Sequence, residues 1–177
     1  VKVAAVSRLG SDVVLHGDSY SDAFEEARKI ARRSKKRLIH PFDDMHVIAG
    51  QGTIGMEIIR QMSEPIDAIF IAVGGGGLIS GIGCYIKSIR PDIKIIGVQT
   101  TDSDAMIRSI QNGKRIKLKH VGIFSDGTAV KQVGTETFKL AKIVVDDFCI
   151  VSADEICAAT KDIFEDTRTI QEPAGAM

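Results

Sequence analysis

The chain has 177 residues, 44% of them hydrophobic and 26% charged, and its 23 basic side chains equal its 23 acidic ones. This composition predicts a soluble globular protein that is large enough for one good core or for parts of two. The balanced charge argues against a nucleic-acid partner, and no apolar run approaches the roughly 20 residues of a membrane span, so we expect no membrane partner either.

The spacing of cysteines and histidines argues against a disulfide framework and against a zinc site. Cys84, Cys149 and Cys157 are odd in number and form no C-x-x-C pair, and the four histidines form no H-x-x-x-H or H-E-x-x-H pair. Structural disulfides and metal sites usually need such paired spacing. We therefore expect a reducing compartment, which is the cytoplasm or, in a eukaryote, an organelle matrix or stroma.

The first part of the chain predicts helices and short strands in alternation. Residues 1–9 have the character of a helix end, which Gly10 terminates. Residues 12–16 and 37–40 are typical of strands. Between them, a stripe of apolar side chains, formed by Ala23, Ala27, Ile30 and Ala31, predicts a helix over residues 20–35.

A turn and a loop are expected next. Pro41-Phe-Asp-Asp44 carries two carboxylates, and after a proline such residues more often serve the turn than acid–base chemistry. The small residues from Val47 to Thr53 predict a loop that leads into a helix ending near Met62.

The most informative segment is Val73-Gly-Gly-Gly-Gly-Leu78. The apolar run 68–73 before it predicts a strand buried in a parallel sheet, and apolar residues at helical spacing after it predict a helix that stops at Arg90-Pro91. Successive glycines can turn their N–H groups toward one point, and a helix N-terminus attracts negative charge. The sequence therefore predicts a phosphate site at residues 74–77.

Two better-known glycine loops are excluded by their spacing. A nucleotide triphosphatase loop ends in Gly-Lys-Ser/Thr, whereas this one ends in Gly77-Leu-Ile79. A dinucleotide fingerprint needs G-x-G-x-x-G, and from Gly74 or Gly75 the last position falls on Ile79 or Ser80. The remaining alternative is a glycine-rich turn that only packs tightly.

The later elements continue the same alternation. We expect a strand at 94–99, a helix at 103–112 capped by Asp102 or Ser103, an irregular segment at 121–130 and a helix at 134–142. Strands near 143–145 and 148–151 follow, and a helix at 154–168 begins with a Ser152/Glu155 capping box. The pattern predicts an α/β fold, with a parallel sheet that carries helices on both faces and binds ligands at the carboxyl ends of its strands.

These motifs, in this order, resemble the fold-type II pyridoxal-phosphate enzymes, the tryptophan synthase beta-like family, and within them the threonine dehydratases of the biosynthetic type. The resemblance covers essentially the whole chain; its most specific segments are 8–17, 40–53, 74–78, 125–130, 154–168 and 172–175. It implies a pyridoxal 5'-phosphate-dependent lyase that converts L-threonine to 2-oxobutanoate and ammonia, the first step of isoleucine biosynthesis.

The resemblance also assigns binding residues and domains. By motif, the resemblance implies that the cofactor phosphate is bound by Gly74, Gly75, Gly76, Gly77 and Leu78. It also implies that Gly127 lies beside the cofactor and Glu172 near its ring. Residues 1–45 correspond to the remainder of a small α/β domain, and residues 46–177 to part of the large cofactor-binding α/β domain. We expect a fragment that lacks both ends of a longer enzyme, and a homo-oligomer, a tetramer by family resemblance.

Two family features have no match in this chain. The Schiff-base lysine of the family lies in a Ser/Ala-Phe-Lys-x-Arg-Gly-Ala motif, which we expect upstream, and Thr137-Phe-Lys139 lacks the Arg-Gly pair. We therefore assign no catalytic residue, expect Lys139 to be solvated, and expect the 177 residues alone to be inactive. Relatives that racemise serine bind a cation through a carboxylate where this chain has Gln99, a poorer ligand, so we expect no metal.

Alternative functions stay open at this point. The same fold serves serine dehydratases, serine racemases and cysteine-forming β-replacement enzymes, and phosphate binding alone does not separate them. A phosphate-binding fragment without activity is the non-enzymatic alternative.

Overall fold

The computed structural model describes residues 2–177. It divides into two compact units, one that ends at Leu38 and one that runs from Ile39 to Met177, and each is taken by itself below. The assignment of residues 1–45 and 46–177 to the two domains of the family stays a prediction.

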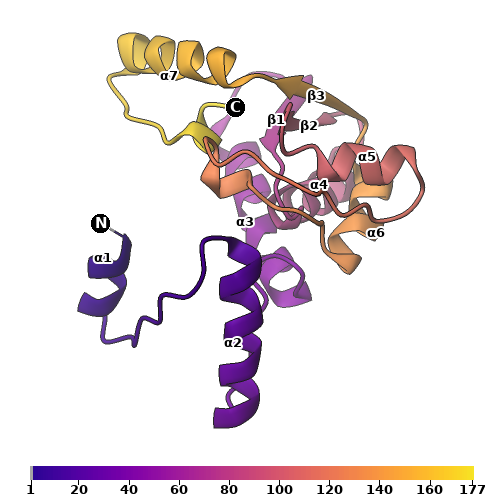
Figure 1. Cartoon of the computed structure of the whole chain (residues 1–177). Coiled ribbons are helices and arrows are strands. Elements are labelled where there is room, and N and C mark those ends of the chain that lie inside the picture. Colours follow the sequence, from indigo (N-terminus) through magenta and orange to yellow (C-terminus); the bar gives the residue numbers. More distant parts are fainter. Residues whose placement is uncertain (1) are drawn as a thin grey trace. The chain divides into compact units, whose positions relative to one another are not determined.

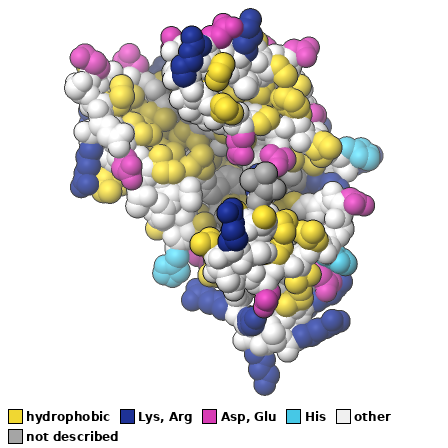
Figure 2. All heavy atoms as spheres, turned by 90° about the vertical axis from the view of Figure 1, so that its left-hand side faces the viewer, with side chains coloured by type: hydrophobic (Ala, Val, Ile, Leu, Met, Phe, Trp, Pro, Cys, Tyr) yellow, Lys and Arg dark blue, Asp and Glu magenta, His cyan; other side chains and the backbone are white. Residues whose placement is uncertain are grey.

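The first unit consists of two helices, α1 (Lys2–Arg8) and α2 (Tyr20–Ser34) (Figure 1). Both end where the sequence predicts, because Gly10 and Lys35 take left-handed backbone angles, with φ of 84° and 53°. The side chain of Ser19 caps α2 by accepting a hydrogen bond from the N–H of Asp22. Arg32 and Arg33 lie exposed in the last turn of α2, and Figure 2 shows a group of dark blue basic side chains at the lower edge of that view.

The strands predicted at 12–16 and 37–40 are wrong, because both segments are irregular. Val14, Leu15 and Ile39 are 63%, 77% and 65% exposed. A strand needs a neighbour to pair with its backbone N–H and C=O groups. No strand among residues 2–177 pairs with either segment.

The second unit is built on three parallel strands, β1 (Ala68–Ala72), β2 (Lys94–Thr100) and β3 (Asp147–Val151), in the order β1-β2-β3. Figure 1 shows them side by side among helices. The helices of this unit are α3 (Met45–Gln61), α4 (Gly77–Ile89), α5 (Ala105–Gln111), α6 (Thr135–Val144) and α7 (Ala153–Thr167), with single turns of 3₁₀ helix at η1 (Asp126–Thr128) and η2 (Pro173–Gly175). The predicted α/β fold with a parallel sheet is confirmed.

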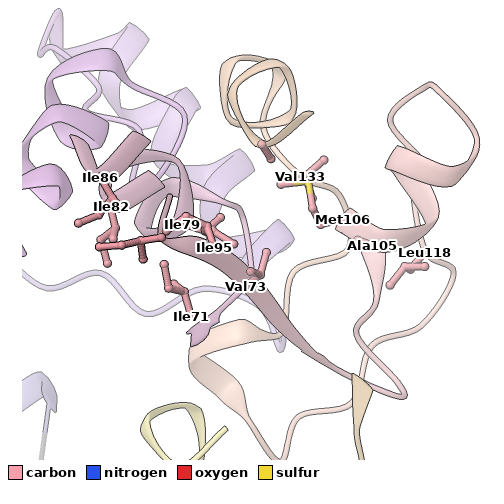
Figure 3. Packing of buried hydrophobic residues seen from close by; sticks show 12 residues of the cluster. Ile71, Val73, Ile79, Ile82, Ile86, Ile95, Ala105, Met106, Leu118 and Val133 are labelled. Atoms are coloured by element: carbon pink, nitrogen blue, oxygen red, sulfur yellow. The ribbon is translucent and has the colours of Figure 1, made fainter. Parts of the chain in front are cut away.

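The core lies between α4 and one face of this sheet. Ile79, Ile86 and Ile95 are fully buried, and Figure 3 shows Ile79, Ile82 and Ile86 along α4 beside Ile71 and Ile95 of the strands. On the opposite face, Phe70 is 65% exposed. No helix formed by residues 2–177 is long and apolar enough to cross a membrane.

The loop predicted at Val47 to Thr53 is wrong, since these residues belong to α3. Gly52 in this segment, and Gly55 just beyond it, serve helix packing instead of a turn. A Cβ on Gly52 would lie 3.2 Å from the carbonyl oxygen of Gly81, and one on Gly55 would lie 3.3 Å from the Tyr85 ring. The small residues therefore let α3 approach α4 closely, which a loop assignment based on glycine content overlooks.

Two smaller predictions also need correction. The strand expected at 143–145 is the end of α6, because Ala141 and Val144 are buried at helical spacing while Ile143 is 78% exposed. Tertiary packing here overrides the strand propensity of β-branched residues. The N-cap of α5 is Asp104, with no side-chain capping bond, instead of Asp102 or Ser103. The capping box predicted at the start of α7 is confirmed.

An ion pair between Lys87 of α4 and Asp146 joins this helix to the start of β3. Lys87 Nζ lies 2.7 Å from one carboxylate oxygen, and that oxygen also accepts the N–H of Ile95 at 2.6 Å. Burial alone would raise the pKa of Asp146, but the hydrogen bonds from Lys87 and Ile95 outweigh it and hold the pKa below its usual value.

We predict that Lys87→Met removes a pH-dependent part of the stability. Because the folded-state pKa of Asp146 is lowered, its contribution is present above the unfolded-state value of about 4 and is lost as the pH falls through the folded-state value. Urea unfolding at several pH values should show the largest gap between wild type and variant above about pH 5, narrowing below about pH 4. A gap that widens at low pH would contradict this assignment.

Candidate functional site

The glycine loop, residues Gly74–Gly77, joins the carboxyl end of β1 to the start of α4. Gly75, Gly76 and Gly77 are buried, while Gly74 and Leu78 are partly exposed. Gly76 is the N-cap of α4, with a φ of 95° that favours glycine, and it has no side chain with which to cap this helix. The first N–H groups of a helix have no acceptor within the helix. The loop thus presents donors at the positive end of a 13-residue helix.

Close packing explains why these positions are glycine. A Cβ on Gly75 would lie 2.3 Å from the Phe42 ring, and one on Gly76 would lie 2.6 Å from Met106 Cε and 3.0 Å from Thr137 Cβ. The sequence argument, that a Cβ would obstruct an incoming anion, is therefore incomplete. At these positions a side chain would first collide with the walls of the protein around the loop.

The turn at Pro41–Asp44 forms one of these walls. Phe42 also lies beside Gly77, where a Cβ would come within 3.0 Å of it. His40 Nδ1 accepts hydrogen bonds from the N–H groups of Phe42 and Asp43, at 3.3 and 3.0 Å. Burial lowers the pKa of His40, against the opposing effect of the nearby carboxylates, which suits a neutral imidazole that accepts hydrogen bonds.

Asp43 and Asp44 act as helix caps, a role that the turn interpretation does not predict. Asp44 accepts the N–H groups of His46 and Val47 at the start of α3. Asp43 reaches across to α6 and accepts the N–H groups of Thr135, Glu136 and Thr137, at 2.7, 2.8 and 3.2 Å. The turn is therefore fixed to two helices.

Of the other predicted site residues, Gly127 lies against Gly74 of the loop, and Glu172 lies against Gly127. A Cβ on Gly74 would lie 3.0 Å from Thr128 Cα and 3.3 Å from the Gly127 oxygen, and one on Gly127 would lie 3.4 Å from Glu172 Oε1. Residues that are about 50 to 100 positions apart in the sequence are thereby brought to one place. The structure thus places Gly127 against the glycine loop and Glu172 against Gly127.

Two buried side chains outside the loop, Gln99 and Thr137, donate hydrogen bonds to carbonyl groups in the loop and next to it. Gln99, which is 1% exposed at the carboxyl end of β2, donates from Nε2 to the carbonyl oxygens of Val73 and Ser103 at 2.9 and 3.1 Å. Its Oε1 accepts the N–H of Ile107 at 2.9 Å. Thr137, fully buried on α6, donates from Oγ1 to the carbonyl oxygen of Gly75 at 2.7 Å.

The donor set fits a phosphate group. The first turn of α4 supplies the N–H groups of Gly77, Leu78 and Ile79, which point out of the helix N-terminus, and the glycine loop supplies more. Hydrogen bonds to a charged acceptor contribute about 1.5–3 kcal/mol each, so several of them can hold a phosphate without a lysine or arginine. The residues present therefore fit the phosphate end of pyridoxal phosphate.

The structure gives Lys139 a surface role and shows no metal cluster. The Lys139 side chain is 63% exposed on α6 and pairs with Glu136 at 2.8 Å, in agreement with the expectation that it is solvated. Within residues 2–177, no three His, Cys, Asp or Glu side chains gather as they would around a metal ion. The three cysteines are free thiols.

Comparison with known proteins decides the family. The family model for pyridoxal-phosphate dependent enzymes matches residues 1–177, the whole chain. The chain belongs to this family. Pyridoxal 5'-phosphate, the cofactor implied by the sequence resemblance, is the one from which the family takes its name.

Similar curated proteins are threonine dehydratases. The chain is 53% identical over 180 residues to the biosynthetic L-threonine dehydratase IlvA of Burkholderia multivorans, and 53% identical over 178 residues to the mitochondrial threonine dehydratase of Schizosaccharomyces pombe. All of this chain is matched, but only 36% and 30% of those proteins. The chain thus spans about a third of the length of these relatives.

Solved structures agree on the fold. The processed form of threonine deaminase isoform 2 from Solanum lycopersicum matches with a TM-score of 0.94 and 44% identity, over 99% of this chain and 48% of that one. Maize serine racemase matches with a TM-score of 0.92 and 31% identity, over 99% of this chain and 54% of that one. The fold-type II architecture is therefore shown, and the higher identity lies with the threonine deaminase.

Several residues that surround the loop escaped the sequence analysis. In the sequence, Thr137 stands out only as part of a motif without its Arg-Gly pair, and no signal there ties it to Gly75. Gln99 was interpreted only as a poor metal ligand. Its position at the carboxyl end of a central strand was an available signal, because ligand sites of parallel sheets collect there.

Proposed function

We propose that the full-length protein carrying this chain is a pyridoxal 5'-phosphate-dependent L-threonine ammonia-lyase, which forms 2-oxobutanoate and ammonia in isoleucine biosynthesis. The observation that supports it best is the glycine loop, because its donors and its walls fit a phosphate and the chain belongs to a family that uses this cofactor. The substrate rests on the threonine dehydratases that match the whole chain at 53% identity.

In this proposal, the cofactor phosphate binds to the loop. The N–H groups of Gly74, Gly75, Gly76, Gly77 and Leu78 would hold it, with support from the positive end of α4. Gly127 would line the other side of the cofactor, because it lies against Gly74 of the loop, and Glu172 would lie near the ring, because it lies against Gly127. When bound, the cofactor supplies an electron-accepting ring that eases loss of a proton from the substrate Cα.

The described residues bind and orient; they hold no group that we assign to proton transfer. Lys139 points to solvent in an ion pair, so burial does not activate it. We therefore expect the lysine of the family motif elsewhere in the full-length protein, and no activity from these 177 residues alone. No metal is proposed, because Gln99 uses both ends of its amide in hydrogen bonds to backbone groups.

A serine-specific enzyme of the same fold is the second candidate function, since maize serine racemase shares the architecture. Assays of the full-length protein with threonine and serine separate the two. We predict formation of 2-oxobutanoate from threonine with a higher kcat/KM than formation of pyruvate from serine. No 2-oxobutanoate, or racemised serine as the main product, would refute the proposal.

Assembly and compartment stay proposals as well. We expect a homo-oligomer, a tetramer by family resemblance, which sedimentation of the full-length protein would test. We expect the cytoplasm, or an organelle matrix or stroma in a eukaryote. The names of relatives from fission yeast and tomato, which are called mitochondrial and chloroplastic, support the second case.

A further inference from the structure

We propose that Gln99 and Thr137 are positioning residues, which aim the N–H groups of Gly74 and Gly76 at the cofactor phosphate by holding the carbonyl oxygens of Val73 and Gly75. The inference rests on the proposed function, since it concerns how the loop binds that phosphate. It adds two side chains that lie outside the loop in the sequence.

The argument starts from the geometry of the peptide bond. The peptide unit is planar and trans, so its C=O and its N–H point in opposite directions. Holding the carbonyl oxygen of one residue therefore fixes the direction of the N–H of the next. Glycine lacks the Cβ that restricts φ and ψ elsewhere, so the peptide planes of a glycine run rotate easily unless something holds them.

Gln99 holds the first of these planes. Its Nε2 donates to Val73 O at 2.9 Å, so the N–H of Gly74 points away from Gln99. The amide is held in turn, because Nε2 also donates to Ser103 O and Oε1 accepts the N–H of Ile107. With all three bonds made in a fully buried site, the amide has one orientation.

Thr137 holds the second plane. Its hydroxyl donates to Gly75 O at 2.7 Å, and the N–H of Gly134 adds a longer bond of 3.3 Å to the same oxygen. The N–H of Gly76 therefore points away from α6. The next plane is held within α4, because Gly76 O accepts the N–H of Ser80 at 3.0 Å, which directs the N–H of Gly77 out of the helix N-terminus.

The N–H groups of Gly74, Gly76 and Gly77 are thus oriented by the groups that bind the carbonyl oxygen of the same peptide plane. Each N–H points to the opposite side of its plane, where a ligand can accept it. A loop whose donors are already aimed binds an anion more tightly than one that must order itself on binding. Gln99 and Thr137 should therefore affect the phosphate and leave recognition of the ring and aldehyde unchanged.

The test compares two ligands that differ only in the phosphate. Apo full-length protein is titrated with pyridoxal 5'-phosphate and with pyridoxal, followed by absorbance, in the wild type and in Thr137→Val. Valine keeps the shape of threonine and removes only the hydroxyl. We expect affinity for pyridoxal phosphate to fall about tenfold, as for one lost or misaligned hydrogen bond, and affinity for pyridoxal to stay within about twofold.

Two further variants control for general damage. Thr137→Ser keeps the hydroxyl and should restore the preference for the phosphate. Ser109→Ala also removes a fully buried hydroxyl, one that donates to Ala105 O in α5 and not to the loop, and should leave the preference unchanged. If Thr137→Val does not fold, the same two titrations are made with Gln99→Met, which removes the hydrogen bond to the carbonyl oxygen of Val73.

The outcomes separate this inference from the proposed function. An unchanged ratio of the two affinities in a folded Thr137→Val, or an equal loss for both ligands, would overturn the inference. The proposal that the glycine loop binds the phosphate would not be affected by that result. A wild type that binds pyridoxal as tightly as pyridoxal phosphate would overturn the phosphate assignment itself. A selective loss for pyridoxal phosphate that Thr137→Ser restores would support both.

Discussion

Gly76→Asp in the full-length protein should abolish retention of pyridoxal phosphate. Gly76 has a φ of 95°, and a Cβ there would lie 2.6 Å from Met106 Cε and 3.0 Å from Thr137 Cβ. The variant must therefore shift the loop, and it also places a negative charge beside the proposed phosphate. Loss of two aligned charge-assisted hydrogen bonds would weaken binding by more than about 100-fold. Absorbance of the purified protein and titration with the cofactor measure the effect.

Gly113→Asp is the matched control. Gly113 also has a positive φ, of 67°, but nothing lies within 4 Å of a Cβ built there. The control carries the same charge and a similar backbone strain, of about 1–2 kcal/mol, away from the loop. It should keep its cofactor. Cofactor content in Gly76→Asp equal to that of the control would move the phosphate site away from the glycine loop.

Asp43→Ala should have the largest effect on stability among the polar residues around the site. Its carboxylate accepts three N–H groups in the first turn of α6, from a position more than 90 residues earlier in the chain. Removing it uncaps α6 and detaches the turn that carries Phe42 from that helix. We expect a loss of about 2–3 kcal/mol in the free energy of unfolding, measured with urea.

Asp44→Ala provides the comparison for Asp43. Asp44 caps α3 through two N–H groups, both within three residues of it in the sequence. An ordinary cap of this kind contributes about 1 kcal/mol. Equal losses in the two variants would show that the long-range bonds of Asp43 contribute no more than a local cap. The loss of stability in Asp43→Asn should lie between the losses in Asp43→Ala and Asp44→Ala, because asparagine keeps a hydrogen-bond acceptor but loses the charge.

Much of the fold follows from local patterns in the sequence. The apolar run before the glycines, the helical spacing after them and the Ser152/Glu155 capping box each specify their element through neighbouring residues, and the structure agrees. The errors arise where distant residues decide. Gly52 resembles a loop residue until α4 is known to pack against it, and residues 12–16 resemble a strand although no described strand pairs with them.

The site shows the same division. The glycine loop could be predicted from the sequence, because four successive glycines between a predicted strand and a predicted helix are typical of an anion-binding turn. The walls of the loop could not, since Phe42, Met106, Thr128 and Thr137 reach it from four separate segments. The hydrogen bond from Thr137 to the carbonyl oxygen of Gly75 joins two distant segments, so the spacing of residues in the sequence does not predict it.

An experimental structure of the full-length protein with pyridoxal 5'-phosphate is the most direct test of the central claim, that the glycine loop binds the cofactor phosphate. The account predicts phosphate oxygens within hydrogen-bonding distance, about 2.7–3.2 Å, of the backbone nitrogens of Gly74 and Gly76, with Val73 O and Gly75 O still bonded to Gln99 and Thr137. A phosphate bound elsewhere, with the loop nitrogens facing only protein or water, would contradict it.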